Sequence, residues 1–494
     1  MLLHHFLEFT ARRLPDKPAI LCEGTAHTYG EIDAAAGRLA GLLAHHGVRR
    51  GDRVAIFMDN SAQTVVAIYG VLKAGAVFMP INPLTKADKL AYMLNDARAA
   101  CLITEPSLCG VWKEALAQAA TVHTCLTEFQ TAPQASPVCR DEPIDQDLAA
   151  IIYTSGSTGD PKGVMLTHLN MVSAVNSVGG YLGYREDDVV LCVLPLAFDY
   201  GLYQVLMGFK VGASVVLERG FAFPVRILEV MARERVTVLP GVPTIFTLLM
   251  NLGSLSRYDL SALRMITNTA AALSEEHIRR LRNLFPRATL FSMYGLTECK
   301  RVTYLPPEQL DVRPTSVGRG MPNEEVWLVD ENGRRLPNGA TGELVIRGSH
   351  VMRGYWEKPA ETAVRLRPGP NPGERVLYSG DIFRTDAEGW LYFVARKDDI
   401  IKSRGEKVSP REVENVLYSL DGVLEAAVVG VPDAVLGQAI KAFVVLAPGH
   451  AYSEKDVIRH CLSRLESFMA PKHVAFVDAI PKTNTGKIRK LSLA

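Results

Sequence analysis

Closely spaced cysteine pairs are missing from this sequence, although eight cysteines are scattered through its 494 residues. Structural zinc sites and thioredoxin-like redox sites use Cys-x-x-Cys pairs, so neither kind of site is predicted. The spacing also gives no sign of the disulfide framework that staples small secreted domains. A reducing compartment suits such a chain, and we expect a cytoplasmic protein.

A strong excess of either charge is also missing. The chain has 54 lysine and arginine residues against 53 aspartate and glutamate residues, which gives a formal net charge of +1 at pH 7. The cations are spread along the sequence without a long run, whereas a nucleic-acid surface requires a clear basic bias. We therefore expect no nucleic-acid partner.

Long apolar runs are missing as well. A membrane-spanning helix needs about 18 or more apolar residues, so no transmembrane segment is predicted. Residues 1–19 lack the apolar core and the cleavage site of a signal peptide, and they predict a first amphipathic helix. The adjacent pairs His4-His5 and His45-His46 predict no metal site, because neighbours on a helix point in different directions.

What the sequence does contain is the composition of a large globular protein, 48% hydrophobic and 22% charged, long enough for more than one domain. In the first half, short β-like runs alternate with helical segments. Residues 53–58 predict a strand, 61–74 a helix and 75–80 another strand, and strand-like runs recur up to 265–266. This alternation predicts a layered α/β architecture.

The pattern changes near residue 320. Short strands separated by turn residues predict a β-rich subdomain, with strands at 325–330, 342–347 and 390–394. A small α+β domain is predicted after the charged run 396–399. Its elements are expected at 410–420, 424–431, 442–446 and 453–465.

Residues 153–164, YTSGSTGDPKGV, are the most informative stretch. They follow the apolar run 148–152, which predicts a buried strand. Small polar residues bury little apolar surface, but their backbone N–H groups and hydroxyls can surround an anion. A strand, a glycine-rich loop and Lys162 in this order suit nucleotide phosphates, although the P-loop string G-x-x-x-x-G-K-[ST] is missing. Taken alone, such a loop is more often a flexible turn.

Other segments carry groups that suit a nucleotide. Tyr294–Glu298 (YGLTE) follows a β-like run, and a carboxylate beside a triphosphate usually acts through Mg²⁺. Tyr378–Asp381 (YSGD) ends in an aspartate that can accept both hydrogen bonds of a ribose diol, or can form an Asx-turn. Lys487 follows a Thr-Gly turn near the chain end, where a lysine either is a mobile cationic tail or neutralises charge during attack on phosphorus.

In their order along the chain, the motifs resemble those of the adenylate-forming superfamily, which includes acyl- and aryl-CoA synthetases, firefly luciferase and the adenylation domains of peptide synthetases. The resemblance spans almost the entire chain, and an ordered series is far more specific than one motif. The matching motifs are YTSGSTGDPKG, LPLAFDYG, YGLTE, GELVIRG, YSGD, RKDDIIKSRG and PKTNTGKIRK.

The resemblance implies a fold class and a division of the chain. The α/β fold has a large N-terminal domain of layered α/β subdomains plus a β-rich subdomain, over residues 1–397. A small mobile C-terminal α+β domain covers 398–494 and rotates about a hinge at Asp398. Lys487 bridges the substrate carboxylate and the α-phosphate in the first half-reaction. Lys402 and Gly405 lie on the face that is brought in for the thiol step.

The resemblance also implies ATP, Mg²⁺ and coenzyme A. Thr297 contacts the α-phosphate and Glu298 binds Mg²⁺. Asp381 holds the ribose hydroxyls with Arg396 nearby. The remaining residues implied for the nucleotide are Thr154, Ser155, Gly156, Ser157, Thr158, Gly159 and Lys162 at the β- and γ-phosphates, Ala270 and Ala271 along adenine, and Tyr294 and Gly295.

The acid pocket is implied by Phe198-Asp199-Tyr200, which falls at the family's acyl-pocket motif. In amino-acid adenylation domains an aspartate at the matching place pairs with the substrate amino group. Our hypothesis is that Asp199 recognises an amino group, and the alternative is that it faces solvent or caps a helix. The other residues implied for the pocket are Thr269, Ser292, Met293, Gly295 and Leu296.

The predicted function is AMP-forming acid–thiol ligation. A small-molecule carboxylic acid, such as anthranilate or benzoate, reacts with ATP to give an acyl-adenylate and then with CoA to give a thioester. The alternatives are a fatty acyl-CoA synthetase and a stand-alone amino-acid enzyme, for proline for example, that loads an acyl-carrier protein. A luciferase-type oxidising enzyme and a non-catalytic binding protein are less favoured, because Glu298, Asp381 and Lys487 are all present.

Overall fold

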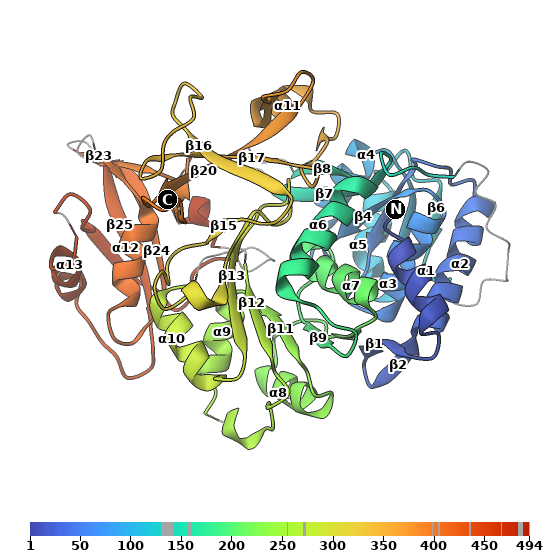
Figure 1. Ribbon diagram of the computed structural model, residues 1–494, viewed down its shortest axis with the longest axis horizontal. Coiled ribbons are helices and arrows are strands. Elements are labelled where there is room, and N and C mark those ends of the chain that lie inside the picture. The colour runs from blue at the N-terminus through green and yellow to red at the C-terminus, as the bar shows by residue number, and fades with distance from the viewer. Residues whose placement is uncertain are drawn as a thin grey trace.

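The computed structural model describes residues 1–129, 142–155, 161–253, 255–269, 273–397, 399–403, 406–433, 436–465, 467–482 and 488–493. Figure 1 shows the N-terminal part of the chain at one end of the molecule and the C-terminal part at the other. The predicted α/β class, with a large N-terminal portion and a smaller C-terminal α+β portion, is confirmed. The domain boundary at 397/398 stays a prediction.

A seven-stranded sheet forms one layer of the N-terminal portion, in the order β18-β8-β7-β4-β3-β5-β6. The central strands β7, β4, β3 and β5 are parallel neighbours, as the alternation of strands and helices predicts. The strands are β3 (Arg53–Phe57), β4 (Val77–Ile81), β5 (Ala99–Thr104), β6 (Thr124–Leu126), β7 (Leu148–Ser155), β8 (Pro161–Thr167) and β18 (Gly354–Tyr355).

A nine-stranded sheet forms a second layer, in the order β15-β14-β13-β12-β11-β9-β10-β1-β2. Because β10, β9, β11, β12 and β13 are parallel, their carboxyl ends meet at one edge. The strands are β1 (Pro18–Cys22), β2 (Thr25–Thr28), β9 (Val189–Cys192), β10 (Ser214–Leu217), β11 (Val238–Gly241), β12 (Met265–Asn268), β13 (Thr289–Tyr294), β14 (Thr303–Leu305) and β15 (Arg319–Gly320).

Helices cover these sheets, and one continuous apolar core joins side chains from both of them. The first helix is the amphipathic one predicted at the N-terminus, and it buries Phe6 and Leu7. The helices are α1 (His5–Arg13), α2 (Tyr29–His45), α3 (Ala62–Lys73), α4 (Ala87–Asp96), α5 (Cys109–Leu116), α6 (His168–Leu182), α7 (Asp199–Val211), α8 (Pro224–Arg233), α9 (Pro243–Met250) and α10 (Glu275–Leu284). Within the described ranges, no helix combines the length and the apolar character needed to cross a membrane.

The β-rich subdomain is antiparallel, with strand order β16-β17-β20-β19 and β21 paired to β20. The three strands predicted there are present. The elements are β16 (Glu324–Val329), β17 (Thr341–Gly348), α11 (Pro359–Arg365), β19 (Leu366–Pro368), β20 (Arg375–Thr385) and β21 (Leu391–Arg396).

The C-terminal portion has an apolar core of its own, built from buried side chains such as Val413, Val428 and Val457. Its sheet has the order β23-β22-β25-β24, with β26 beside β25. Figure 1 shows α12 on the side that faces α10. The elements are β22 (Ile401–Ser403), β23 (Glu406–Val408), α12 (Pro410–Tyr418), β24 (Val423–Asp433), β25 (Gly437–Leu446), α13 (Glu454–Leu462) and β26 (His473–Phe476).

A buried ion pair fixes the amino ends of the parallel strands. The Asp188 side chain, just before β9, is 1% exposed and lies 2.5 Å from an Arg264 nitrogen, just before β12. Thr237 donates a further hydrogen bond of 2.7 Å to the Asp188 carboxylate. The pair therefore joins two strands that are 76 residues apart in sequence.

We predict that Arg264→Met destabilises the fold strongly, because Asp188 is then left buried and unpaired. Breaking such a pair costs about 3–5 kcal/mol, which lowers the apparent melting temperature by several degrees. Thermal unfolding followed by circular dichroism measures the change. The double variant Asp188→Asn with Arg264→Met should recover part of the loss, and a double variant less stable than Arg264→Met would contradict this account.

Candidate active site

Strands β7 and β8 hold the two flanks of the glycine loop opposite each other. Their antiparallel register pairs Thr154 with Lys162 and Ser155 with Pro161. Residues 156–160 lie outside the described residues, so the phosphate roles predicted for Gly156, Ser157, Thr158 and Gly159 stay predictions. The flanks place Thr154 and Lys162 side by side at the end of the seven-stranded sheet.

Tyr355 connects the Lys162 flank to Glu298. The Lys162 ammonium lies 5.8 Å from the centre of the Tyr355 ring, and the Tyr355 hydroxyl donates a 2.8 Å hydrogen bond to Glu298 Oε1. The Met352 N–H also donates to the Glu298 carbonyl over 2.7 Å. Burial and the Glu298 charge raise the pKa of Tyr355, so the hydroxyl stays protonated and keeps donating. The structure thus brings Lys162 and Glu298, predicted from separate motifs, to the two sides of one tyrosine.

Asp381 joins the last residue of β13 to the β-rich subdomain. The Tyr294 hydroxyl donates to Asp381 Oδ2 over 2.6 Å, and Arg396 Nε lies 3.7 Å from Asp381 Oδ1. The antiparallel register of β20 and β21 sets Asp381 directly opposite Arg396. Asp381 is only 8% exposed, so its carboxylate is held in a defined place. All three residues were predicted at the nucleotide site, and they form one contact group.

A tight turn after Tyr294 sets where Thr297 and Glu298 lie. The Lys300 N–H donates to the Leu296 carbonyl over 2.7 Å, and the Val302 N–H donates to the Tyr294 carbonyl over 2.9 Å. A Cβ on Gly295 would overlap the Lys300 carbonyl oxygen, so only glycine fits at this point. The turn carries Thr297 and Glu298 at its half-buried tip.

The predicted acid-pocket motif forms the start of α7. Phe198 is the N-cap residue and Asp199 is the first helical residue, where the helix dipole favours a negative charge. Asp199 is 6% exposed and makes no capping hydrogen bond, so the alternative in which it faces solvent or caps the helix is wrong. A Cβ on Gly201 would overlap the Pro195 carbonyl, which explains the glycine that follows Tyr200.

Aromatic side chains pack between α6, α7 and the nine-stranded sheet. The Tyr200 hydroxyl lies 2.7 Å from the Thr267 carbonyl of β12. Tyr181 stacks on Tyr304 with ring centres 3.9 Å apart, and its hydroxyl lies 2.9 Å from the Met293 sulfur. The predicted pocket residues Thr269, Ser292 and Met293 are buried, whereas Leu296 is half-buried. Because side chains alternate along a strand, Ser292 and Met293 point to opposite faces of β13.

Lys300 and Arg301 are functional candidates that the sequence reasoning missed. Lys300 is 2% exposed, with its ammonium 5.4 Å from the centre of the Tyr203 ring. Arg301 is 5% exposed, with its guanidinium 4.5 Å from the centre of the Tyr200 ring. Burial lowers the pKa of Lys300 to about 8, although the Asp199 carboxylate opposes this shift. The available signal was the charged pair that follows YGLTE after a single cysteine, Cys299.

Several predicted residues lie outside the described residues. These are Ala270, Ala271, Asp398, Gly405 and Lys487, and the side chain of Lys402 lies outside them too. On either side of Lys487, Lys482 contacts the Glu425 carboxylate and Lys490 donates to Glu414 over 2.7 Å. The roles predicted for the undescribed residues stay predictions.

The C-terminal portion contacts the N-terminal portion through α12. The Ser409 hydroxyl donates to the Val394 carbonyl over 2.5 Å, and the Tyr418 ring lies 5.9 Å from the His277 ring of α10. His277 also contacts Thr247 Oγ1 at 2.9 Å and Ser274 Oγ at 2.6 Å. Burial lowers the pKa of His277 to about 4, so this contact uses a neutral imidazole at neutral pH.

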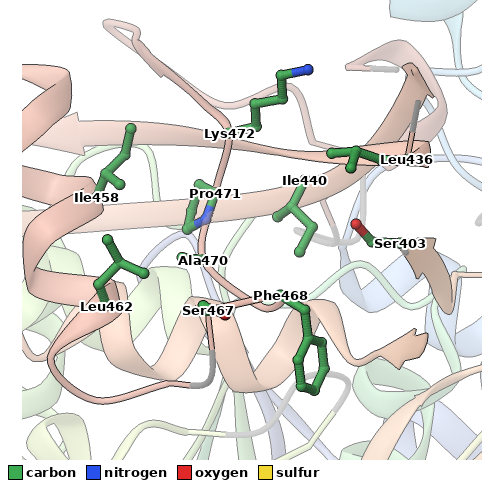
Figure 2. A pocket seen from close by; sticks show the side chains of 10 residues that line it. All are labelled: Ser403, Leu436, Ile440, Ile458, Leu462, Ser467, Phe468, Ala470, Pro471 and Lys472. Atoms are coloured by element: carbon green, nitrogen blue, oxygen red, sulfur yellow. The ribbon is translucent and has the colours of Figure 1, made fainter. Parts of the chain in front are cut away.

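A groove of about 480 Å³ lies within the C-terminal portion, apart from the groups described above. Figure 2 shows Ile440 of β25 with Ile458 and Leu462 of α13 along it. The Lys472 ammonium at its edge is paired with Asp433 at 2.5 Å. The lining is mainly apolar and brings no carboxylate, so the groove is not the site that handles ATP.

Two protein-family models match this chain. Residues 7–356 match the family model of the AMP-binding enzymes, and residues 412–487 match the model of the C-terminal domain of the same enzymes. The chain belongs to the AMP-binding enzyme family. It is an AMP-forming acid–CoA ligase of the adenylate-forming superfamily, and its substrates include ATP and CoA.

Individual relatives match this ligase over nearly its full length. It is 33% identical to a long-chain-fatty-acid–CoA ligase of Bacillus subtilis, over 99% of this chain and 94% of the relative. It is 31% identical to 4-coumarate-CoA ligase 1 of Narcissus pseudonarcissus, over 99% and 93%. Among solved structures, the anthranilate CoA ligase AuaEII in complex with anthranoyl-AMP superimposes with a TM-score of 0.92 at 27% identity, covering 100% and 96% of the two chains.

We predict that Tyr355→Phe weakens ATP binding to the ligase by about tenfold or more. The substitution removes the hydrogen bond to Glu298, and a hydrogen bond to a charged group contributes about 1.5–3 kcal/mol. Titration calorimetry with ATP and Mg²⁺ measures the dissociation constant without requiring the acid. The matched control is Tyr392→Phe, which removes a 3.2 Å tyrosine–carboxylate hydrogen bond to Asp386. Equal affinities of the two variants would contradict the role of Tyr355.

Proposed function

We propose that this ligase activates a compact aryl or amino-bearing carboxylic acid, such as anthranilate or benzoate, and transfers it to CoA. The observation that carries the proposal is the buried side chain of Asp199 at the start of α7, next to Phe198 and Tyr200 in the sequence and one turn from Tyr203. No hydrogen bond or ion pair joins this carboxylate to any residue that the structure describes. A buried charge without a partner is costly, and an amino group on the substrate supplies that partner.

ATP is held between the two N-terminal layers and the β-rich subdomain in this proposal. The β- and γ-phosphates are bound by Thr154, Ser155, residues 156–159 and Lys162, and the α-phosphate is bound by Thr297. The Tyr294–Asp381–Arg396 group takes the ribose, because a fixed and nearly buried carboxylate suits a diol. Ala270 and Ala271 lie along adenine.

Glu298 is the proposed holder of Mg²⁺. The Tyr355 hydroxyl donates to Glu298 Oε1, and none of the described residues forms a hydrogen bond with Oε2. Oε2 is therefore available to Mg²⁺, which prefers oxygen ligands. Bound Mg²⁺ neutralises phosphate charge that otherwise repels the incoming carboxylate. The chain's own contribution is the Tyr355 hydrogen bond, which fixes the orientation of the carboxylate.

Two half-reactions share this site. The acid carboxylate attacks the α-phosphate, pyrophosphate leaves, and the acyl-adenylate then carries AMP as a good leaving group. Lys487 steadies the carboxylate and the α-phosphate in the first step. Rotation of the 398–494 domain about Asp398 removes Lys487 and brings Lys402 and Gly405 to the thiol.

A fatty acid is the second candidate substrate, favoured by the similarity to the Bacillus subtilis enzyme. Loading of a separate acyl-carrier protein remains the alternative to CoA for an amino-acid substrate such as proline. A cytoplasmic location goes with either candidate. Release of pyrophosphate over a panel of aryl, amino and fatty acids, with and without CoA, separates the candidates. Activity confined to long-chain acids would overturn the compact-acid proposal.

We predict that Asp199→Ala lowers kcat/KM for anthranilate at least tenfold while changing the value for benzoate little. The substitution removes the partner of the amino group and leaves the aromatic contacts in place. Asp199→Asn is the matched variant, because it keeps the shape and removes the charge. Steady-state AMP formation measures the effect. Equal losses for the two acids would contradict amino-group recognition.

We predict that Lys487→Ala lowers acid-dependent pyrophosphate release by about a hundredfold or more, as loss of a positioned charge does in other active sites. Thioester formation from a synthetic acyl-adenylate and CoA should be retained, because Lys487 acts only in the first step. Lys490→Ala is the control, since Lys490 is paired with Glu414 nearby. Unchanged pyrophosphate release in Lys487→Ala would contradict the assignment.

A further inference from the structure

The acid pocket contains two buried cations whose purpose the reaction does not explain. The Lys300 ammonium and the Arg301 guanidinium lie against Tyr203 and Tyr200, both on the first turns of α7. Neither residue belongs to the groups assigned to ATP. Both are more than nine-tenths buried, at 2% and 5% exposure.

The polar atoms of these side chains have few partners. Lys300 Nζ, Arg301 Nε and the Tyr203 hydroxyl are buried without a hydrogen-bond partner. Within the described part of the chain, no carboxylate lies within ion-pair distance of either cation, and the Arg301 side chain reaches only the Lys300 carbonyl at 3.3 Å. Buried charges are normally paired, so the unpartnered N–H and O–H donors of this cluster suit a ligand with several acceptor oxygens.

The backbone at Lys300 adopts an unfavourable conformation, as it also does at Glu23, Arg98, Arg235, Asn323 and Glu357. The φ angle of Lys300 is 70°, in the left-handed region that a lysine rarely adopts. The Lys300 N–H and the contact with Gly295 hold it there. A glycine or asparagine would adopt this conformation more easily, so lysine occupies position 300 despite an unfavourable backbone conformation. Strain of this kind gathers at ligand sites.

The arrangement along α7 places the Lys300 ammonium one helical turn beyond Asp199, and the Arg301 guanidinium beside Tyr200, the next residue after Asp199. Asp199 and Tyr203 are four residues apart and share one face of the helix, about one turn from each other. The reacting carboxylate must meet the α-phosphate beside Thr297, at the tip of the turn. Lys300 instead lies over the Tyr203 ring, one turn beyond Asp199.

We propose that Lys300 and Arg301 bind a second carboxylate of the acid substrate, at the end remote from the reacting carboxylate. The ligase thereby prefers a compact acid with a second carboxylate to a monoacid such as benzoate or anthranilate, and Asp199 accepts an amino group where the acid carries one. The inference rests on the proposed function in one respect, namely that the acid occupies the pocket at α7. It adds a preference for a second anionic end within the class of compact acids.

Matched pairs of acids test the proposal. The pairs are benzoate with isophthalate and butyrate with glutarate, and the measured quantity is the ratio of kcat/KM for the diacid to that for the monoacid. We expect a ratio of about ten or more for wild type in at least one pair, since charged hydrogen bonds contribute a tenfold to hundredfold preference. In Lys300→Met and Arg301→Met the ratio should fall toward one through loss of the diacid reaction. A wild-type preference for the monoacid in both pairs would overturn the proposal.

Controls separate recognition from damage to the fold. Lys300→Arg and Arg301→Lys keep the charge and should retain most of the diacid preference. These two variants also test the proposal if the methionine variants fail to fold. Arg264→Met removes a partly buried cation at the opposite edge of the sheet, so it should lower stability and leave the ratio unchanged. A ratio that falls equally in Arg264→Met would contradict a direct role. Absence of AMP formation with every acid would instead contradict the proposed function.

Discussion

The close approach of the backbone at Gly295 is the constraint on which the site depends. Here the chain leaves the carboxyl end of β13 and folds back so tightly that Gly295 touches the carbonyl of Lys300. Tyr294, at one side of the contact, reaches Asp381, whereas Glu298, at the tip, reaches Tyr355. Lys300, on the returning segment, reaches Tyr203 of α7. One turn therefore positions the side chains proposed to bind the ribose, the phosphates and the acid, and any larger residue at 295 would move all of them together.

The two edges of the nine-stranded sheet differ in whether their buried charges form ion pairs. At the amino ends, Asp188 is fully satisfied by Arg264 and Thr237, so the charge contributes to the fold and is closed to ligands. At the carboxyl ends, Asp199 and Lys300 influence each other electrostatically without forming an ion pair. Parallel strands bring helix starts and loop tips to this second edge, where ligands of open α/β sheets bind. Among the described residues, the unpaired charges of Asp199 and Lys300 thus lie at the edge where the substrate is proposed to bind.

Much of the fold was predictable because it rests on local patterns. The alternation at 53–80 predicts β3, α3 and β4, and the turn-rich stretch after 320 predicts the antiparallel strands. The order of the motifs identified the family. Tyr355 was not predictable as a partner of Glu298, because 57 residues separate the two and Tyr355 lies in the seven-stranded sheet whereas Glu298 follows a strand of the nine-stranded sheet. The burial of Lys300 and Arg301 was also hidden, since a charged pair before a short strand is usually exposed.

In the proposed function, substrate selection and chemistry share one turn. Glu298 and Lys300 lie on that turn, two residues apart, so an acid bound to Lys300 would also restrain the segment that orients Glu298 toward Tyr355. Asp199 is the second proposed anchor, on the first turn of a helix in which a Cβ at Gly201 would overlap the Pro195 carbonyl. An acid that contacts both anchors is held between rigid elements, with its reacting end directed at the tip of the turn. A monoacid contacts fewer anchors, so it loses orientation as well as binding energy, and its rate falls with its affinity.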